Sequence, residues 1–247
     1  MTLIIALSCK NGIVFASDSQ ATVTSSGGPV RVESKKIYKI NESTLFGASG
    51  SVGTIQKGLS IIQAIEDLKS DWNVTIMQDV RKQLFPIYKS EVERHVIFHK
   101  TLNPNRIPPL PIADIILTKV QEKEENIIWH IAPDCNDELL QDLGYGCTGN
   151  GDIFAHTLLK GFDIRNMEVE EGKLIAYNAI KLAIETGAFG LGEPIDIWSI
   201  IKKDKKTEVK NLSKDELMAL KDTWFMWKKI EKELFKKIVF RRTKEEG

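Results

Sequence analysis

The stretch that decides the fold is the N-terminal segment 1–18, MTLIIALSCKNGIVFASD. Two apolar runs flank the dipeptide Asn11-Gly12, the pair most typical of a two-residue hairpin turn. Both residues tolerate the positive φ that a type I′ turn requires, so the turn fixes the register of the strands. We therefore predict a β-hairpin that brings Asp18 back beside Thr2.

Thr2 becomes the N-terminal residue once the initiator methionine is removed. A threonine that has a free α-amine and a neighbouring carboxylate is a nucleophile that carries its own base. The alternative is a purely structural role, because threonine is an ordinary strand residue. The rest of the chain has to decide between these two interpretations.

Composition limits the classes of protein to consider. The 247 residues suffice for one large core, or for one domain with an appendage. A hydrophobic content of 42% and a charged content of 28% are typical of soluble globular proteins. Acidic and basic residues are equal in number, 34 each, so no overall field favours nucleic acid or an anionic membrane as a partner.

No signal peptide is evident, and no apolar run approaches the ~20 residues of a membrane span, so we expect a cytoplasmic protein. Cys9, Cys135 and Cys147 are odd in number and widely spaced, which indicates reduced thiols rather than disulfides or a zinc site. The histidines lack the spacing of metal ligands. We predict neither a metal nor a cofactor.

Hydrophobic periodicity predicts strands, two helices, strands, two helices and strands in that order. Two antiparallel sheets, each covered by a helix pair, satisfy this order as a four-layer αββα sandwich over residues 1–210. The segment 21–30 is predicted to be a loop because of its small residues and its Gly-Gly pair. The predicted strands are 32–40, 44–48, 113–120, 126–131, 142–147 and 195–201, and the predicted helices are 52–68, 75–96, 152–160 and 169–186.

Two proline-related predictions and one for the tail complete the outline. Pro86 marks a kink or a boundary in the second helix, and the proline-rich segment 100–111 is a loop. Residues 211–247 form a helical extension, since Ser213 and Glu216 make a capping box before a long amphipathic pattern. The helix either packs on the parent domain or contacts a partner subunit.

Several short features add chemistry to Thr2 and Asp18. Lys35 and Lys36 are adjacent on a strand and cannot both point inward; we select Lys36 because Ile37 then fits the core pattern. Gly50 lies in a turn before a helix N-terminus, where free N–H groups can stabilise an oxyanion. Asn150 lies in a second tight turn before a helix.

Four strings together resemble the β-type subunits of the proteasome and their prokaryotic relatives, including HslV and Anbu. They are ASDSQAT (16–22), VESKKI (32–37), SGSVGTIQ (49–56) and GNGDIFAHTLL (149–159). Their order and spacing match this family from Thr2 to about Ile201. The resemblance implies the fold of N-terminal-nucleophile (Ntn) hydrolases and a threonine-type peptidase acting through an acyl-enzyme.

Carried over by position, the resemblance makes Thr2 the nucleophile and Lys36 the cation that lowers the pKa of its hydroxyl. Asp18 would hold Lys36 charged, and the N–H of Gly50 would form the oxyanion hole. Asn150 stands where the family has a serine near the α-amine. The positions that line the substrate cleft in the family are Ala21, Thr22, Ser34, Ala48 and Val52.

Two further departures concern the α-amine. Ala188 and Leu191 fall near the positions where the family has an aspartate and a serine that support it, and neither has a polar side chain. This keeps three hypotheses open: a peptidase, a peptide ligase that passes the same acyl group to an amine, and a ring subunit that has lost activity. The expected partners are a peptide or unfolded protein and further copies of the chain in a ring.

Overall fold

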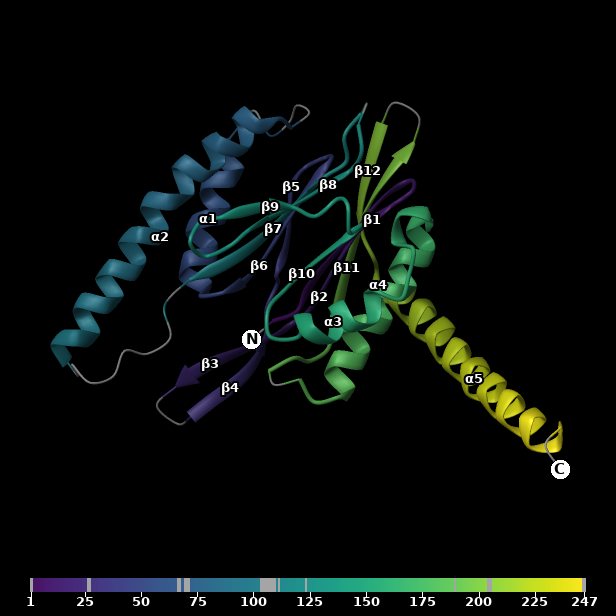
Figure 1. Cartoon of the computed structure of the whole chain (residues 1–247). Helices are drawn as coiled ribbons and strands as arrows, with labels where there is room; N and C mark the ends of the chain where they lie inside the picture. Colours follow the sequence, from purple (N-terminus) through teal and green to yellow (C-terminus); the bar gives the residue numbers. More distant parts are fainter. Residues whose placement is uncertain are drawn as a thin grey trace. The chain divides into compact units, whose positions relative to one another are not determined.

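The computed structural model describes residues 2–25, 28–65, 68, 72–102, 110, 112–122, 124–188, 190–203 and 206–245. The chain divides into two compact units, residues 1–211 and residues 212–247. Each is described by itself below, with the labels of Figure 1.

The first sheet of the larger unit has the strand order β10-β1-β2-β11-β12. All neighbouring strands in it run antiparallel. Its strands are β1 (Ile4–Cys9), β2 (Gly12–Asp18), β10 (Tyr145–Thr148), β11 (Ile195–Lys203) and β12 (Lys206–Asn211). The N-terminal hairpin is confirmed, since β1 pairs with β2 from Ile4 opposite Ser17 to Cys9 opposite Gly12.

The turn of this hairpin differs from the prediction. Its two residues are Lys10 and Asn11, because Gly12 already pairs with Cys9. Neither turn residue has a positive φ, so the type I′ turn is wrong. Gly12 serves packing instead: a Cβ built there would lie 2.0 Å from the carbonyl oxygen of Ile200.

The second sheet has the order β5-β6-β7-β8-β9 and is also antiparallel. Its strands are β5 (Ile37–Asn41), β6 (Thr44–Gly50), β7 (Ala113–Lys119), β8 (Ile127–Ile131) and β9 (Asp137–Leu139). Its inner face packs on the first sheet in a shared core that includes Ile4, Phe15, Leu45, Ile116 and Ile128, all fully buried.

Helix pairs cover the outer faces of the two sheets (Figure 1). The first pair is α1 (Val52–Ala64) and α2 (Val74–Leu102), and the second is α3 (Asp152–Leu159) and α4 (Val169–Glu185). A second apolar core, with Trp72 and Trp129 at its centre, fills the space between α1, α2 and their sheet. The predicted four-layer αββα sandwich is confirmed.

One prediction about the elements is wrong, and one of the two alternatives given for Pro86 is wrong. Segment 21–30 is not a loop but most of a two-stranded sheet, β3 (Gln20–Ser25) and β4 (Gly28–Glu33), because its Thr and Val residues favour strands on both sides of the glycines. Pro86 does not end α2, which runs on to Leu102. The sequence pattern also missed β9 and β12. The predicted loop 100–111 lies mostly outside the described residues, and its first three residues belong to α2.

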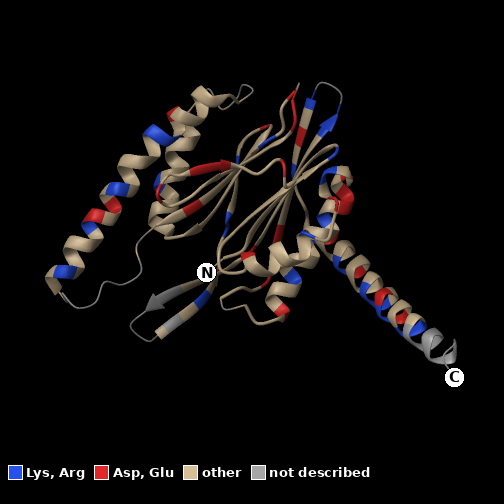
Figure 2. Ribbon diagram, viewed as in Figure 1, with Lys and Arg blue, Asp and Glu red and all other residues tan. Residues whose placement is uncertain are grey.

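The smaller unit contains α5 (Lys214–Glu245). Its predicted capping box is present: the N–H of Ser213 donates to Glu216 at 2.9 Å, and the N–H of Glu216 donates to Ser213 Oγ at 3.3 Å. Basic and acidic residues both occur along α5 and along α2, so each helix carries charges of both signs (Figure 2).

Candidate active site

The site is built around Thr2, which lies two residues before the start of β1. Thr2 is 8% exposed, and Asp18 at the end of β2 is fully buried. One carboxylate oxygen of Asp18, Oδ1, accepts the main-chain N–H of Leu3 at 2.9 Å and the Lys36 ammonium at 2.6 Å. The hairpin therefore anchors the residue next to Thr2 to a buried carboxylate and its cation.

The second oxygen of Asp18 is also occupied. Its Oδ2 accepts the N–H of Gln20 at 3.1 Å and that of Gly192 at 3.3 Å. Four donors around one carboxylate offset the cost of burying it. Burial lowers the pKa of Lys36, against the opposing pull of the Asp18 charge and hydrogen bond.

The two adjacent lysines have opposite environments. Lys36 is 7% exposed and points inward to Asp18. Lys35 is exposed, with its ammonium over the rings of Tyr38 and Trp198 at 5.1 and 5.4 Å from their centroids. Both lysines lie in the connection between β4 and β5, which interrupts the predicted strand 32–40. This connection directs one cation into the site and leaves the other outside.

Thr2 borders a cavity of about 700 Å³. Gly50 and Asn150, the residues of the two predicted turns, line the same cavity. Three of the five predicted catalytic residues therefore share one cavity wall, and the remaining two, Asp18 and Lys36, form the buried pair beside it.

Two glycines shape this wall. Gly50 has φ +115°, and a Cβ there would lie 2.2 Å from the carbonyl oxygen of Ile112. Gly149 has φ +103°, and a Cβ there would lie 2.1 Å from the carbonyl oxygen of Thr2. Only glycine allows the backbone after β10 to come so close to Thr2.

Two residues at which the sequence departs from the family pattern have different environments. Asn150 is exposed at the cavity. Leu191 is 7% exposed, and its Cδ1 lies 2.7 Å from where a Cβ on Gly151 would be. The apolar side chains of Leu191 and Leu3 thus fill the space beside Gly151.

The predicted cleft residues lie elsewhere. Ala21 and Thr22 belong to β3, Ser34 follows β4, and Val52 begins α1 with 59% exposure. Ala48 is 2% exposed and its side chain belongs to the core under α1 and α2, so only its main chain can face a substrate. None of these five residues lines the cavity beside Thr2.

Sequence reasoning missed a second charged network at the cavity. Asp114 of β7 lines it, and its Oδ1 is hydrogen-bonded to Nε2 of His130 on β8. The other ring nitrogen of His130 contacts Glu138 of β9 at 3.0 Å. Burial alone would lower the pKa of His130, but the hydrogen bonds and charges of Asp114 and Glu138 raise it above 6.5.

A link between the two sheets was also missed. The hydroxyls of Ser49 on β6 and Thr148 on β10 are 3.0 Å apart and buried. Ser49 pairs with Asp114 across β6 and β7, while Thr148 pairs with Ile4 across β10 and β1. This hydrogen bond therefore joins the sheet that carries Thr2 to the sheet that carries Gly50 and Asp114.

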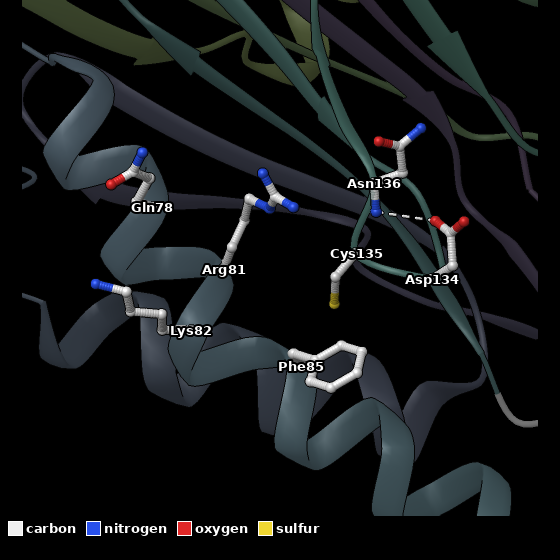
Figure 3. Close-up of a pocket in the computed structure, with 7 residues that line it drawn as sticks. All are labelled: Gln78, Arg81, Lys82, Phe85, Asp134, Cys135 and Asn136. Carbon is white, nitrogen blue, oxygen red and sulfur yellow. Dashed lines mark hydrogen bonds between the residues drawn. The ribbon is translucent and has the colours of Figure 1, made fainter.

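A separate pocket of about 620 Å³ lies between α2 and the β8–β9 connection (Figure 3). Arg81 points across it toward the connection, and its charge is balanced by Asp137 at 2.7 Å. Burial raises the pKa of the Cys135 thiol in this pocket to about 11, and that of Cys9 to about 12. Both thiols are protonated at neutral pH and are poor nucleophiles compared with a thiolate.

The described residues include neither a helix that could span a membrane nor a group that could bind a metal ion. None of the described helices is both long and apolar enough to cross a membrane. The same residues contain no group of three or more His, Cys, Asp or Glu side chains placed to hold a metal ion.

Comparisons with known proteins relate the chain to proteasome subunits. Residues 2–74 match the family model described as proteasome subunit. The proteasome subunit beta of Methanocaldococcus sp. (strain FS406-22) is 26% identical over 214 residues, covering 83% of this chain and 84% of the relative. That of Ferroglobus placidus is also 26% identical, covering 89% and 93%.

Solved structures give the same fold. The helical assembly of the Anbu complex from Pseudomonas aeruginosa matches with a TM-score of 0.71 and 12% identity, covering 95% of this chain and 96% of that one. A Gly-1 mutant of Anbu from Hyphomicrobium sp. strain MC1 matches with a TM-score of 0.66 and 14% identity, covering 96% and 97%.

Proposed function

Because the chain is a distant relative of the proteasome-type Ntn hydrolases, we propose that it is a threonine peptidase whose nucleophile is Thr2. The proposal requires that Met1 is removed, which frees the α-amine. The observation that carries it is the buried Asp18–Lys36 pair, which is hydrogen-bonded to the residue directly after Thr2.

The proposed reaction proceeds in two steps. The α-amine takes the proton of the Thr2 hydroxyl while the hydroxyl oxygen bonds to a peptide carbonyl carbon. The C–N bond of that peptide then breaks, and the proton passes to the leaving amine. An ester remains on Thr2, and water splits it to regenerate the hydroxyl. The N–H of Gly50 would hold the oxyanion in both steps.

The buried pair would support proton movement. The Lys36 ammonium favours the developing negative charge on the Thr2 oxygen, and Asp18 holds that ammonium in place. Because burial lowers its pKa, Lys36 exchanges a proton more readily than an ordinary lysine. The expected substrates are peptides or unfolded proteins in the cytoplasm.

A second candidate is a peptide ligase. Leu191 is a buried apolar residue, and it falls near a position where the resemblance implies a polar group that supports the α-amine. An amine without that partner is a weaker base for activating water, so the ester would persist until an amine attacks it. The added peptide would then replace the first leaving group, and no net hydrolysis would occur.

Intact-mass spectrometry tests the proposal. We expect the mature protein to lack Met1 and, mixed with a peptide pool, to gain a peptide mass that maps to Thr2. Thr2→Ala should abolish the adduct and turnover, whereas Thr223→Ala on α5, which removes an equally small hydroxyl from an exposed site, should retain both. Retained Met1, or no turnover by the wild-type protein, would leave a ring subunit without catalysis as the better function. Full activity of Thr2→Ala would exclude Thr2 as the nucleophile.

Adding an amine-bearing peptide separates the two enzyme candidates. Release of free acids indicates the peptidase, and a joined peptide without free acid indicates the ligase. We also propose that the chain self-associates, with support from the helical assembly described for the Anbu relative. A purely monomeric mass in solution would contradict that part.

A further inference from the structure

The cavity beside Thr2 has an asymmetric charge. Asp114 and Asp152 line it, and no Lys or Arg does so among the residues that the structure describes. The remaining lining consists of small hydroxyl, amide and glycine residues, including Ser51 and Asn150, and of the apolar residues Leu110, Ile112 and Pro133. A group that enters this cavity therefore meets carboxylates and neutral hydrogen-bonding groups.

Asp114 is held in a fixed position. It lies in β7 opposite Ser49 of β6, and His130 binds its Oδ1. Its side chain is 32% exposed, while that of His130 is 18% exposed. In the described part of the chain the hydrogen bonds of this carboxylate use only Oδ1, so Oδ2 can accept a bond from a ligand.

His130 does not cancel the negative charge. Glu138 contacts its second nitrogen, so a protonated His130 is shared by two carboxylates. With Asp152 the set has three carboxylates and at most one cation, a net charge of −2 or −3. A cation entering the cavity gains charge-assisted hydrogen bonds, whereas an anion is repelled.

The position of the cavity indicates which part of a substrate it receives. The positions matched to the family's cleft, such as Ala21, Thr22 and Ser34, belong to β3 or follow β4 and do not line it. The cavity is thus distinct from the positions that the resemblance assigns to the cleft, and Thr2 borders the cavity directly. If the acyl part of a peptide lies along those positions, its amine part enters the cavity.

Resting on the proposed acyl transfer by Thr2, we propose that this cavity is a specificity subsite for a lysine or arginine side chain on the amine side of the attacked bond. Asp114 is the residue that recognises the cation, and Asp152 supports it. His130 is a positioning residue that holds Asp114.

A peptide pool with matched variants tests the subsite. Pools that carry Lys, Gln or Glu at the first and second positions on the amine side would be incubated with the full-length protein, and the products sequenced by mass spectrometry. We expect turnover to favour Lys over Gln by about tenfold, the size of a charge-assisted hydrogen bond. Pools varied on the acyl side should show no such preference for a cation.

Asp114→Asn should bring the ratio of Lys to Gln turnover close to one, and Asp152→Asn should reduce it by a smaller factor. The ratio is the readout because it does not depend on how much protein folds. Asp134→Asn is the matched control. This exposed aspartate lies on the β8–β9 connection, in the separate pocket and not in the cavity beside Thr2, and the variant should keep the wild-type ratio.

The outcomes separate the two proposals. Turnover through Thr2 without a preference for Lys, or with one that Asp114→Asn preserves, refutes the subsite and leaves the proposed function standing. A preference confined to the acyl side does the same. No acyl transfer from any pool refutes the proposed function, and the subsite falls with it.

Discussion

The two charged networks at Thr2 differ in how far water reaches them. In the Asp18–Lys36 pair the side chains are 0% and 6% exposed. In the second network those of Asp114, His130 and Glu138 are 32%, 18% and 64% exposed. Burial commits the first pair to one arrangement of charge, whereas the second remains able to respond to a ligand and to pH.

The largest effect is expected from breaking the buried pair. Lys36→Met leaves Asp18 charged and buried without its cation, which should lower the free energy of unfolding by about 3–5 kcal/mol. Activity per folded molecule should fall by about 10²- to 10⁴-fold, the range for losing acid–base support. Urea unfolding and single-turnover rates measure the two effects.

Lys35→Met is the matched control for this change. It removes the contacts of an exposed ammonium with two half-buried rings, so we expect a loss below about 1 kcal/mol and activity within a few-fold of wild type. Similar losses in both lysine variants would contradict the assignment of Lys36.

The next effect concerns the backbone contact at Thr2. Gly149→Ala places a methyl group against the Thr2 carbonyl in a conformation that L-residues rarely adopt. We expect a loss of about 2–5 kcal/mol together with slower formation of the acyl-enzyme. Gly187→Ala, at φ +76° with nothing within 4 Å of its Cβ, should cost only about 1–2 kcal/mol. Equal losses would show that strain alone, and not the contact with Thr2, requires glycine.

A smaller effect should follow from removing the link between the two sheets. Ser49→Ala leaves the buried Thr148 hydroxyl without its partner, which costs about 1–3 kcal/mol. Ser60→Ala on the exposed side of α1 removes a hydroxyl bonded to its own helix and should change stability little. Chemical denaturation of the two variants compares them, and an unchanged midpoint for Ser49→Ala would refute the role of the link.

The smallest effect is a pH dependence confined to the open network. The pKa of His130 is raised above 6.5 in the folded state. Protonated His130 therefore stabilises the fold fully below pH 6.5, and this stabilisation is lost as the pH rises through the folded-state pKa. The stability difference between wild type and His130→Gln should therefore shrink as the pH rises above 6.5. His156→Gln, at an exposed site on α3, should not reproduce this trend. A difference that grows with pH would contradict the sign.

The sequence was most informative where partners lie close along the chain. Asp18 and Lys36 could be placed because a hairpin returns Asp18 to Thr2 and because the fit of Ile37 to the core pattern selects Lys36. The Asp114–His130–Glu138 network depends on the register of three strands, and hydrophobic periodicity does not give the register between strands. Its last strand, β9, has only three residues and leaves no period to detect.

The wrong predictions have similar physical causes. The Gly-Gly pair in segment 21–30 suggested a loop, although the flanking Thr and Val residues form β3 and β4 around it. Ala48 is a separate case: its position matches the family's substrate cleft, its side chain fills the core, and only its main chain is left to contact a substrate. A position matched along the sequence does not determine which face of a strand the side chain occupies.

The hydrogen bond from Leu3 to Asp18 gives the molecule a built-in reporter. The same carboxylate oxygen accepts the Leu3 amide and the Lys36 ammonium, so any change in that ammonium alters the electron density that the amide proton senses. In a ¹⁵N-labelled sample, the Leu3 cross-peak in NMR spectra would track ionisation at the reaction centre without a dye, a substrate or a mutation.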